Sequence, residues 1–85
     1  MSMNILFDPT KDAMNIVKHG MSLARAADLD VLAFVPDDRF AEPRFRLHGL
    51  IDGQAYGAAG TDRDGIVRVI SLRRAHAKEM RHHVP

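Results

Sequence analysis

The 85-residue sequence has no cysteine, which excludes disulfide bonds and thiolate chemistry. It has no apolar run long enough to cross a bilayer, and its first residues lack the cationic lead and apolar core of a signal peptide. We therefore expect a cytoplasmic protein with no membrane partner. At this length we expect a single small domain over residues 1–85, which buries a smaller share of its surface than a larger protein does.

Several catalytic signatures are also absent from the sequence. There is no nucleophile elbow, no glycine loop that cradles phosphate, no dinucleotide-binding fingerprint and no zinc-ligand spacing. His82 and His83 are adjacent, but no third ligand lies at a suitable spacing, so we interpret them as a mobile C-terminal tail. His48 stands alone and is expected to be exposed. The sequence therefore predicts neither a cofactor nor a metal site.

Charge is distributed unevenly along the chain. Residues 63–83 contain six Lys or Arg against two acids, whereas residues 1–62 contain six Lys or Arg against nine acids. A cationic segment of this kind favours binding of a polyanion such as nucleic acid, and a merely solvated charged face is the simpler alternative. The six cations are Arg63, Arg68, Arg73, Arg74, Lys78 and Arg81.

Sequence signals of helix ends bracket the first predicted helix, which begins at residue 10 or 11. Asp8 can cap this helix, Pro9 suits its first position, and Gly20 suits the left-handed residue that follows a helix end. Its apolar residues recur at helical spacing, so we expect them to face the core. They are Ala13, Met14, Ile16 and Val17.

A second short helix is predicted at residues 23–28, with Ser22 as its cap. Residues 31–35 form a continuous apolar run that ends at Pro36, which favours a buried strand. Residues 5–7 are a shorter apolar run that we interpret as an edge strand.

The second half of the chain is predicted to form an antiparallel meander. Residues 44–51 alternate as an amphipathic strand, and the pairs Asp52-Gly53 and Asp64-Gly65 are typical of two-residue hairpin turns. Between these turns, residues 54–61 are a weak strand, rich in glycine and alanine. In the strand at 44–51, the residues expected to point inward are Phe45, Leu47 and Ile51. Residues 66–73 show the same alternation and are predicted to form the next strand.

Strict alternation would place Arg68 on one face with Ile70 and Leu72, and Arg73 on the opposite face. After this strand, residues 75–83 are predicted to form a short cationic helix. The expected fold is therefore α+β, with two N-terminal helices, an antiparallel sheet of about four strands and a C-terminal helix.

His19 is the histidine whose setting suggests catalysis, because it follows Lys18 at a helix end and precedes a glycine. A histidine side chain can act as a general base for RNA cleavage by activating a ribose 2′-hydroxyl. Capping of the last helical carbonyls is an equally good interpretation of His19. The sequence leaves both open.

A series of short motifs extends over nearly the whole chain: Phe7-Asp8-Pro9-Thr10-Lys11, Asn15, Lys18-His19-Gly20, Ser22, Arg44-Phe45, Gly49, Thr61-Asp62-Arg63, the run from Arg68 to Ala75, and Glu79. The combination of an early Lys-His-Gly with a late Arg-x-Ile-Ser-x-Arg pattern is fairly specific. Together these motifs resemble the BrnT toxin family of type II toxin–antitoxin systems.

This resemblance implies a RelE-like α/β fold and a metal-independent endoribonuclease that halts translation. It implies a partner as well, a dimeric ribbon-helix-helix antitoxin like BrnA, which would block the toxin in a hetero-oligomeric complex. Carried over by position, the implied catalytic residues are His19, Arg63, Arg68 and Arg73, and the implied RNA-binding residue is Lys18. From the charge pattern, Arg74, Lys78 and Arg81 join it as RNA-binding residues.

A non-catalytic interaction module is the alternative reading of the same charge pattern. In that case the basic C-terminal edge binds nucleic acid or an acidic partner, and no RNA is cut.

Overall fold

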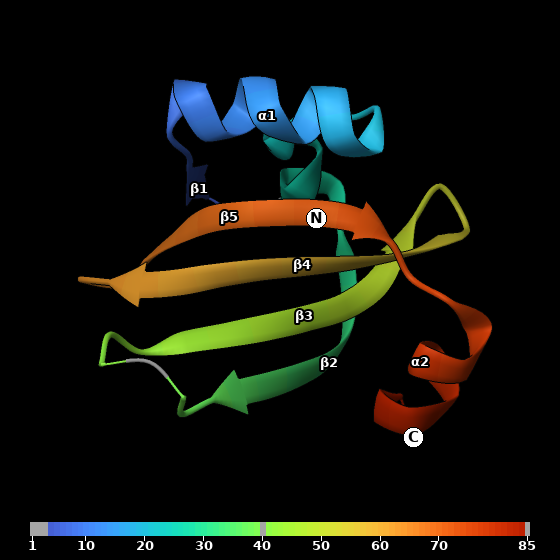
Figure 1. Cartoon of the computed structure of the whole chain (residues 1–85). Helices are drawn as coiled ribbons and strands as arrows, with labels where there is room; N and C mark the ends of the chain where they lie inside the picture. The colour runs from blue at the N-terminus through green and yellow to red at the C-terminus, as the bar shows by residue number, and fades with distance from the viewer. Residues whose placement is uncertain (1–3, 40, 85) are drawn as a thin grey trace.

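Five strands form one mixed sheet in the computed structural model, which describes residues 4–39 and 41–84 except for the side chain of Arg63 (Figure 1). The strand order is β1-β5-β4-β3-β2, with β1 parallel to β5 and the other neighbours antiparallel. The predicted meander is therefore confirmed, and the short edge strand adds a parallel fifth member. The strands are β1 (Ile5–Leu6), β2 (Asp30–Asp37), β3 (Arg44–Ile51), β4 (Gln54–Arg63) and β5 (Ile66–Arg74).

Both predicted hairpin turns are confirmed by the backbone. Asp52 and Gly53 have φ values of 50° and 79°, and Asp64 and Gly65 have 57° and 79°. Two successive residues with positive φ are what a tight turn between twisted strands requires, and Asp and Gly are suited to it. These turns fix the register of β3, β4 and β5.

Helix α1 (Pro9–His19) has the predicted caps and the predicted end, and it begins one residue before the predicted start. The Asp8 carboxylate accepts a hydrogen bond from the Thr10 backbone N–H at 2.7 Å, and Gly20 closes the helix with φ of 76°. The predicted apolar stripe is wrong, because Met14, Ile16 and Val17 are 64%, 46% and 89% exposed.

Instead, α1 is attached to β5 through the buried side chain of Asn15. Its amide nitrogen donates to the carbonyls of Met21 and Leu72, both at 2.9 Å, and its amide oxygen accepts from the Leu72 N–H at 3.2 Å. Among the described residues, strand β1 pairs with β5 only at Val67 and Arg68, and further along β5 the Asn15 side chain pairs with backbone groups of the strand. Hydrogen bonds from a polar residue thus attach α1 to the sheet, where packing of the apolar stripe was expected.

The second predicted helix is a 3₁₀ helix, η1 (Leu23–Asp28), rather than an α-helix. The Ser22 hydroxyl caps it by accepting from the Ala24 N–H at 3.2 Å, as predicted. It packs its apolar residues onto one face of the sheet, where the core lies. The buried apolar residues are Leu23, Ala26, Leu29, Phe45, Leu47, Ile51, Ala58, Val69 and Leu72.

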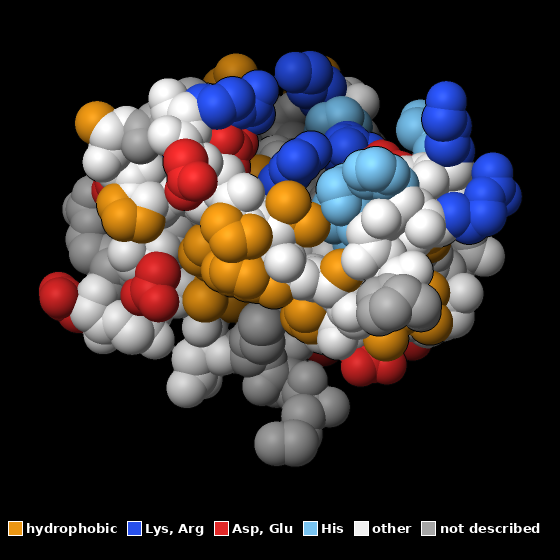
Figure 2. Space-filling model, turned by 90° about the horizontal axis from the view of Figure 1, so that it is seen from below, with side chains coloured by type: hydrophobic (Ala, Val, Ile, Leu, Met, Phe, Trp, Pro, Cys, Tyr) orange, Lys and Arg blue, Asp and Glu red, His pale blue; other side chains and the backbone are white. Residues whose placement is uncertain are grey.

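Strand β2 is at the end of the sheet, so the prediction of a buried strand at residues 31–35 is wrong. Val31, Leu32 and Phe34 are 38%, 42% and 59% exposed. An apolar run shows that a segment is hydrophobic. Whether the strand lies at the centre or at the edge of the sheet depends on long-range pairing, which the run does not specify. Figure 2 views the molecule from below, and a hydrophobic patch is visible on this side.

Helix α2 (Ala77–His83) begins two residues later than predicted. None of its residues, all of which the structure describes, is buried. His82 and His83 belong to this helix, and the His83 ring stacks on His48 with centroids 4.6 Å apart. The interpretation of these two histidines as a mobile tail is therefore wrong.

Candidate functional site

A bulge in β5 decides which side chains share a face. Ser71 is paired with Ala59 and Val69 with Gly60, so Ile70 has no partner across the ladder. The extra residue changes the phase of the alternation, and Arg68 comes to the same face as Ser71 and Arg73. The prediction that Arg68 shares a face with Leu72 is therefore wrong.

The sheet face opposite the core is organised in three rows. Each row runs from a polar residue of β3, across a small residue of β4, to a polar residue of β5. We call this surface the three-row face. Its rows are Arg44–Thr61–Arg68, Arg46–Ala59–Ser71 and His48–Gly57–Arg73.

The small residues of β4 form the floor of a trough. Gly57 and Ala59 lie between the longer side chains of β3 and β5, and the hollow above them has a volume of ≈ 100 Å³. A Cβ placed on Gly57 would lie 3.5 Å from the Glu79 carboxylate and 3.7 Å from the His48 ring. The glycine and alanine content that makes β4 a weak strand by propensity therefore leaves room above it.

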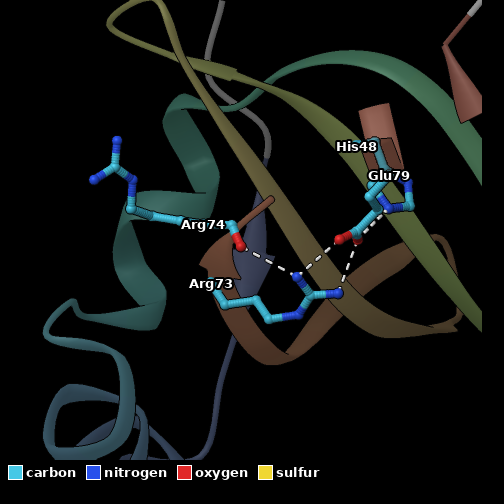
Figure 3. Close-up of polar contacts among 4 residues, drawn as sticks. All are labelled: His48, Arg73, Arg74 and Glu79. Atoms are coloured by element: carbon cyan, nitrogen blue, oxygen red, sulfur yellow. Dashed lines mark hydrogen bonds and ion pairs between the residues drawn. The ribbon is translucent and has the colours of Figure 1, made fainter. Parts of the chain in front are cut away.

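Glu79 of α2 closes one end of the trough (Figure 3). Arg73 donates to its carboxylate in a bidentate arrangement, from Nη1 to Oε2 at 3.0 Å and from Nη2 to Oε1 at 2.8 Å. His48 Nε2 lies 2.9 Å from the same Oε1. The three side chains come from α2, β5 and β3, so this cluster joins the C-terminal helix to the sheet.

The charge of Glu79 is fixed by its neighbours. Hydrogen bonding from Arg73 is the main cause that lowers the pKa of Glu79 to about 2, and His48 adds to it against the opposing effect of burial. Glu79 is therefore a carboxylate at neutral pH.

The pKa of His83, on the same helix, is lowered by partial burial. The nearby charges of His48, His82 and Arg46 act in the same direction.

His48 is 1% exposed, so its predicted exposure is wrong. Its Nδ1 and the Nε of Arg46 are buried and have no hydrogen-bond partner among the described residues. A buried N–H without an acceptor is a costly arrangement that a bound polar group can relieve. Arg46 and His48 both line the trough.

The end of α1 borders the same surface. Lys18 and His19 are exposed and line a hollow of ≈ 250 Å³ together with Ser71 of the middle row. Further along β5, Arg68 lines a second hollow with Lys11 and Arg44. Lys11 and Ile70 line both hollows, so the two hollows are neighbours along β5.

Four of the predicted site residues thus line neighbouring hollows along β5: Lys18 and His19 line one, Arg68 lines the second, and Arg73 lines the trough. Lys78 and Arg81 are exposed on α2 and line one hollow with His82 and His83. Figure 2 shows Lys, Arg and His side chains gathered on one side of that view.

Two predicted residues stand apart from this group. Arg74 is paired with Tyr56 on the other face of the sheet, and Figure 3 shows its side chain pointing away from the cluster. Arg63 has its backbone in β4, but its side chain lies outside the described part of the structure.

Sequence reasoning missed the contribution of β3 and of Glu79. The outward positions of the alternating strand 44–51 already held Arg44, Arg46 and His48, and this was the available signal. Nothing in the sequence alone indicated that Glu79 would reach across Gly57 to two other elements.

Two structural findings concern metals and membranes. In the part of the chain that the structure describes, no group of three or more His, Cys, Asp or Glu side chains is arranged to hold a metal ion. The described helices include none that is long and apolar enough to span a membrane.

The fold is α+β, and one face of its sheet carries the arginines of the three rows. Over residues 7–79 the chain matches the family model for the ribonuclease toxin BrnT of type II toxin–antitoxin systems. The chain belongs to this BrnT family of ribonuclease toxins, and membership implies an antitoxin partner.

A solved structure supports this assignment. The crystal structure of the ribonuclease toxin BrnT of Brucella abortus is 28% identical in sequence and superposes with a TM-score of 0.65. The match covers 88% of the present chain and 99% of the Brucella chain. No curated protein matches the chain.

Proposed function

We propose that the three-row face binds RNA and that the chain cleaves it without a metal ion. The observation that carries this proposal is the convergence of Arg68 and Arg73 with Arg46 on one surface, next to the exposed His19. Arginine is suited to phosphate because its guanidinium stays charged and presents N–H groups in a planar fork. Lys18, Lys78 and Arg81 extend the cationic surface on either side.

In the proposed reaction, the ribose 2′-oxygen forms a bond to the adjacent phosphorus and the bond from phosphorus to the 5′-oxygen breaks. His19 takes the proton of the 2′-hydroxyl, and water supplies a proton to the leaving 5′-oxygen. Arg68 and Arg73 stabilise the charge that develops on the phosphate oxygens. Arg63 belongs to the proposed catalytic set through the resemblance alone, and Arg74 belongs to the RNA-binding set through its charge alone.

The broader assignment follows from the family. We propose that residues 1–85 form one toxin domain with a RelE-like fold, which acts in the cytoplasm and arrests translation. Its proposed partner is a BrnA-like, dimeric ribbon-helix-helix antitoxin in a hetero-oligomeric complex. Support comes from the family match, which names a type II toxin–antitoxin system.

Incubation of the purified toxin with a defined RNA in excess EDTA tests metal-independent cleavage. The proposal requires new 5′-hydroxyl and cyclic-phosphate ends to form at the same rate with and without the chelator. Intact RNA in both reactions, with binding retained, would favour the non-catalytic interaction module. Cleavage that needs added Mg²⁺ would contradict the metal-independent mechanism.

A further inference from the structure

We propose that Glu79 is a positioning residue for RNA cleavage, which acts by holding the Arg73 guanidinium in place at the edge of the trough. This inference rests on the proposed function of the three-row face. It assigns a role in that reaction to a carboxylate, in a surface otherwise dominated by cations.

Burial increases stepwise from the trough edge to its interior. The Arg73 side chain is 39% exposed, Glu79 is 17% exposed, and His48 is 1% exposed. An RNA phosphate approaching the three-row face therefore meets Arg73 first. The Glu79 carboxylate lies behind it, where repulsion between this carboxylate and RNA is reduced.

Arg73 keeps donors for a ligand while it is held by Glu79. A guanidinium has five N–H groups. Three are used within the described structure, two on the Glu79 carboxylate and one on the Arg74 carbonyl at 3.1 Å. The remaining two, the Nε–H and one N–H of Nη2, are available to a phosphate. Glu79 thus orients Arg73 without occupying all of its donors.

Glu79 is itself held from two sides. His48 contributes a hydrogen bond from the buried wall of the trough, next to the backbone of Gly57. Because α2 has no buried residue, this polar cluster is a main attachment of the helix to β3. A guanidinium that is already oriented loses less conformational entropy when it adopts the geometry that stabilises the transition state.

Substitution of Glu79 by Gln tests the proposal, because Gln keeps the shape of the side chain and removes the second acceptor and the charge. Single-turnover cleavage should slow by about 10- to 100-fold, since orientation of a charge-stabilising donor is lost. The dissociation constant for a non-cleavable 2′-deoxy analogue should change less than about threefold, because the charge of Arg73 remains. Asp52→Asn is the matched control, since Asp52 also pairs with an arginine, Arg25 at 3.2 Å, away from the trough.

Two further variants separate positioning from mere attachment of α2. Arg73→Lys keeps the charge but cannot form the bidentate pair, so it should slow cleavage to a similar extent with binding retained. In the double variant of Glu79→Gln with Arg73→Ala, cleavage should be no slower than in Arg73→Ala alone, because Glu79 acts through Arg73. In NMR spectra of the wild type, the Arg73 Nη groups should give separate signals that merge in Glu79→Gln.

The outcomes distinguish this inference about Glu79 from the proposed RNA-cleaving function on which it rests. A wild-type toxin that leaves RNA intact removes the proposed function and this inference together. If the wild type is active and Glu79→Gln cleaves at an equal or higher rate, or binds the analogue more tightly, the carboxylate does not position Arg73 and the inference fails. Additive losses in the double variant would equally overturn it.

Discussion

Arg68 and Arg73 lie on the same face of β5 although they are five residues apart in a strand. An odd separation places side chains on opposite faces of a regular strand. The unpaired Ile70 between them shifts the phase by one residue, so both arginines face the trough. The cationic surface of this toxin therefore depends on a local irregularity of the sheet.

Asn15 should be the residue of α1 whose loss costs most stability. Asn15→Leu would remove three hydrogen bonds and leave the N–H of Leu72 unpaired in the interior. We expect the free energy of unfolding to fall by about 2 to 3 kcal/mol. Urea denaturation measures this. Val17→Ser, on the exposed face of the same helix, is the control and should cost less than about 0.5 kcal/mol.

Substitution by alanine should have opposite effects on the free energy of unfolding at Gly49 and at Gly57. At Gly49 a Cβ would overlap the carbonyl oxygen of Asp30 and lie 2.8 Å from its carbonyl carbon, so Gly49→Ala should cost about 1 to 3 kcal/mol through displacement of β2. At Gly57 the nearest atom would be 3.5 Å away, an ordinary contact. Gly57→Ala should leave stability unchanged or raise it by up to about 1 kcal/mol. Equal melting temperatures for the two variants would contradict this account.

Acid should weaken the attachment of α2. The pKa of Glu79 is lowered from its ordinary 4.5 to about 2, so the stability that it contributes is present above pH 4.5 and is lost as the pH falls towards 2. Thermal unfolding between pH 5 and pH 2 should therefore show a steeper loss of stability in the wild type than in Glu79→Gln. Parallel curves for the two proteins would show that the carboxylate does not contribute.

Local sequence signals predicted the parts of the fold that local chemistry determines. The cap at Asp8, the left-handed Gly20 and the two Asp-Gly turns depend on a few neighbouring residues, and all are confirmed. The inward residues of β3 were also predictable, because alternation continues without a break along this strand.

Features that depend on long-range pairing were not predictable from the sequence. The exposure of Phe34 follows from the position of β2 at the sheet edge, and the shared face of Arg68 and Arg73 follows from pairing with β4. The burial of His48 requires α2 to lie over β3, with Glu79 above Gly57. For the candidate site, charge and resemblance identified Arg68 and Arg73, but they did not identify the β3 side of the trough.

The central claim is that the three-row face is where RNA is cleaved. Arg68→Ala tests it most directly, because Arg68 is exposed and its loss should leave the fold intact. The control is Arg25→Ala, an arginine on η1 that pairs with Asp28 and Asp52. In a single-turnover assay with chelator present, we predict that Arg68→Ala cleaves RNA about 100-fold more slowly than wild type, a loss typical of one charge-stabilising donor, and that Arg25→Ala cleaves at the wild-type rate. Equal rates for Arg68→Ala and wild type would contradict the account.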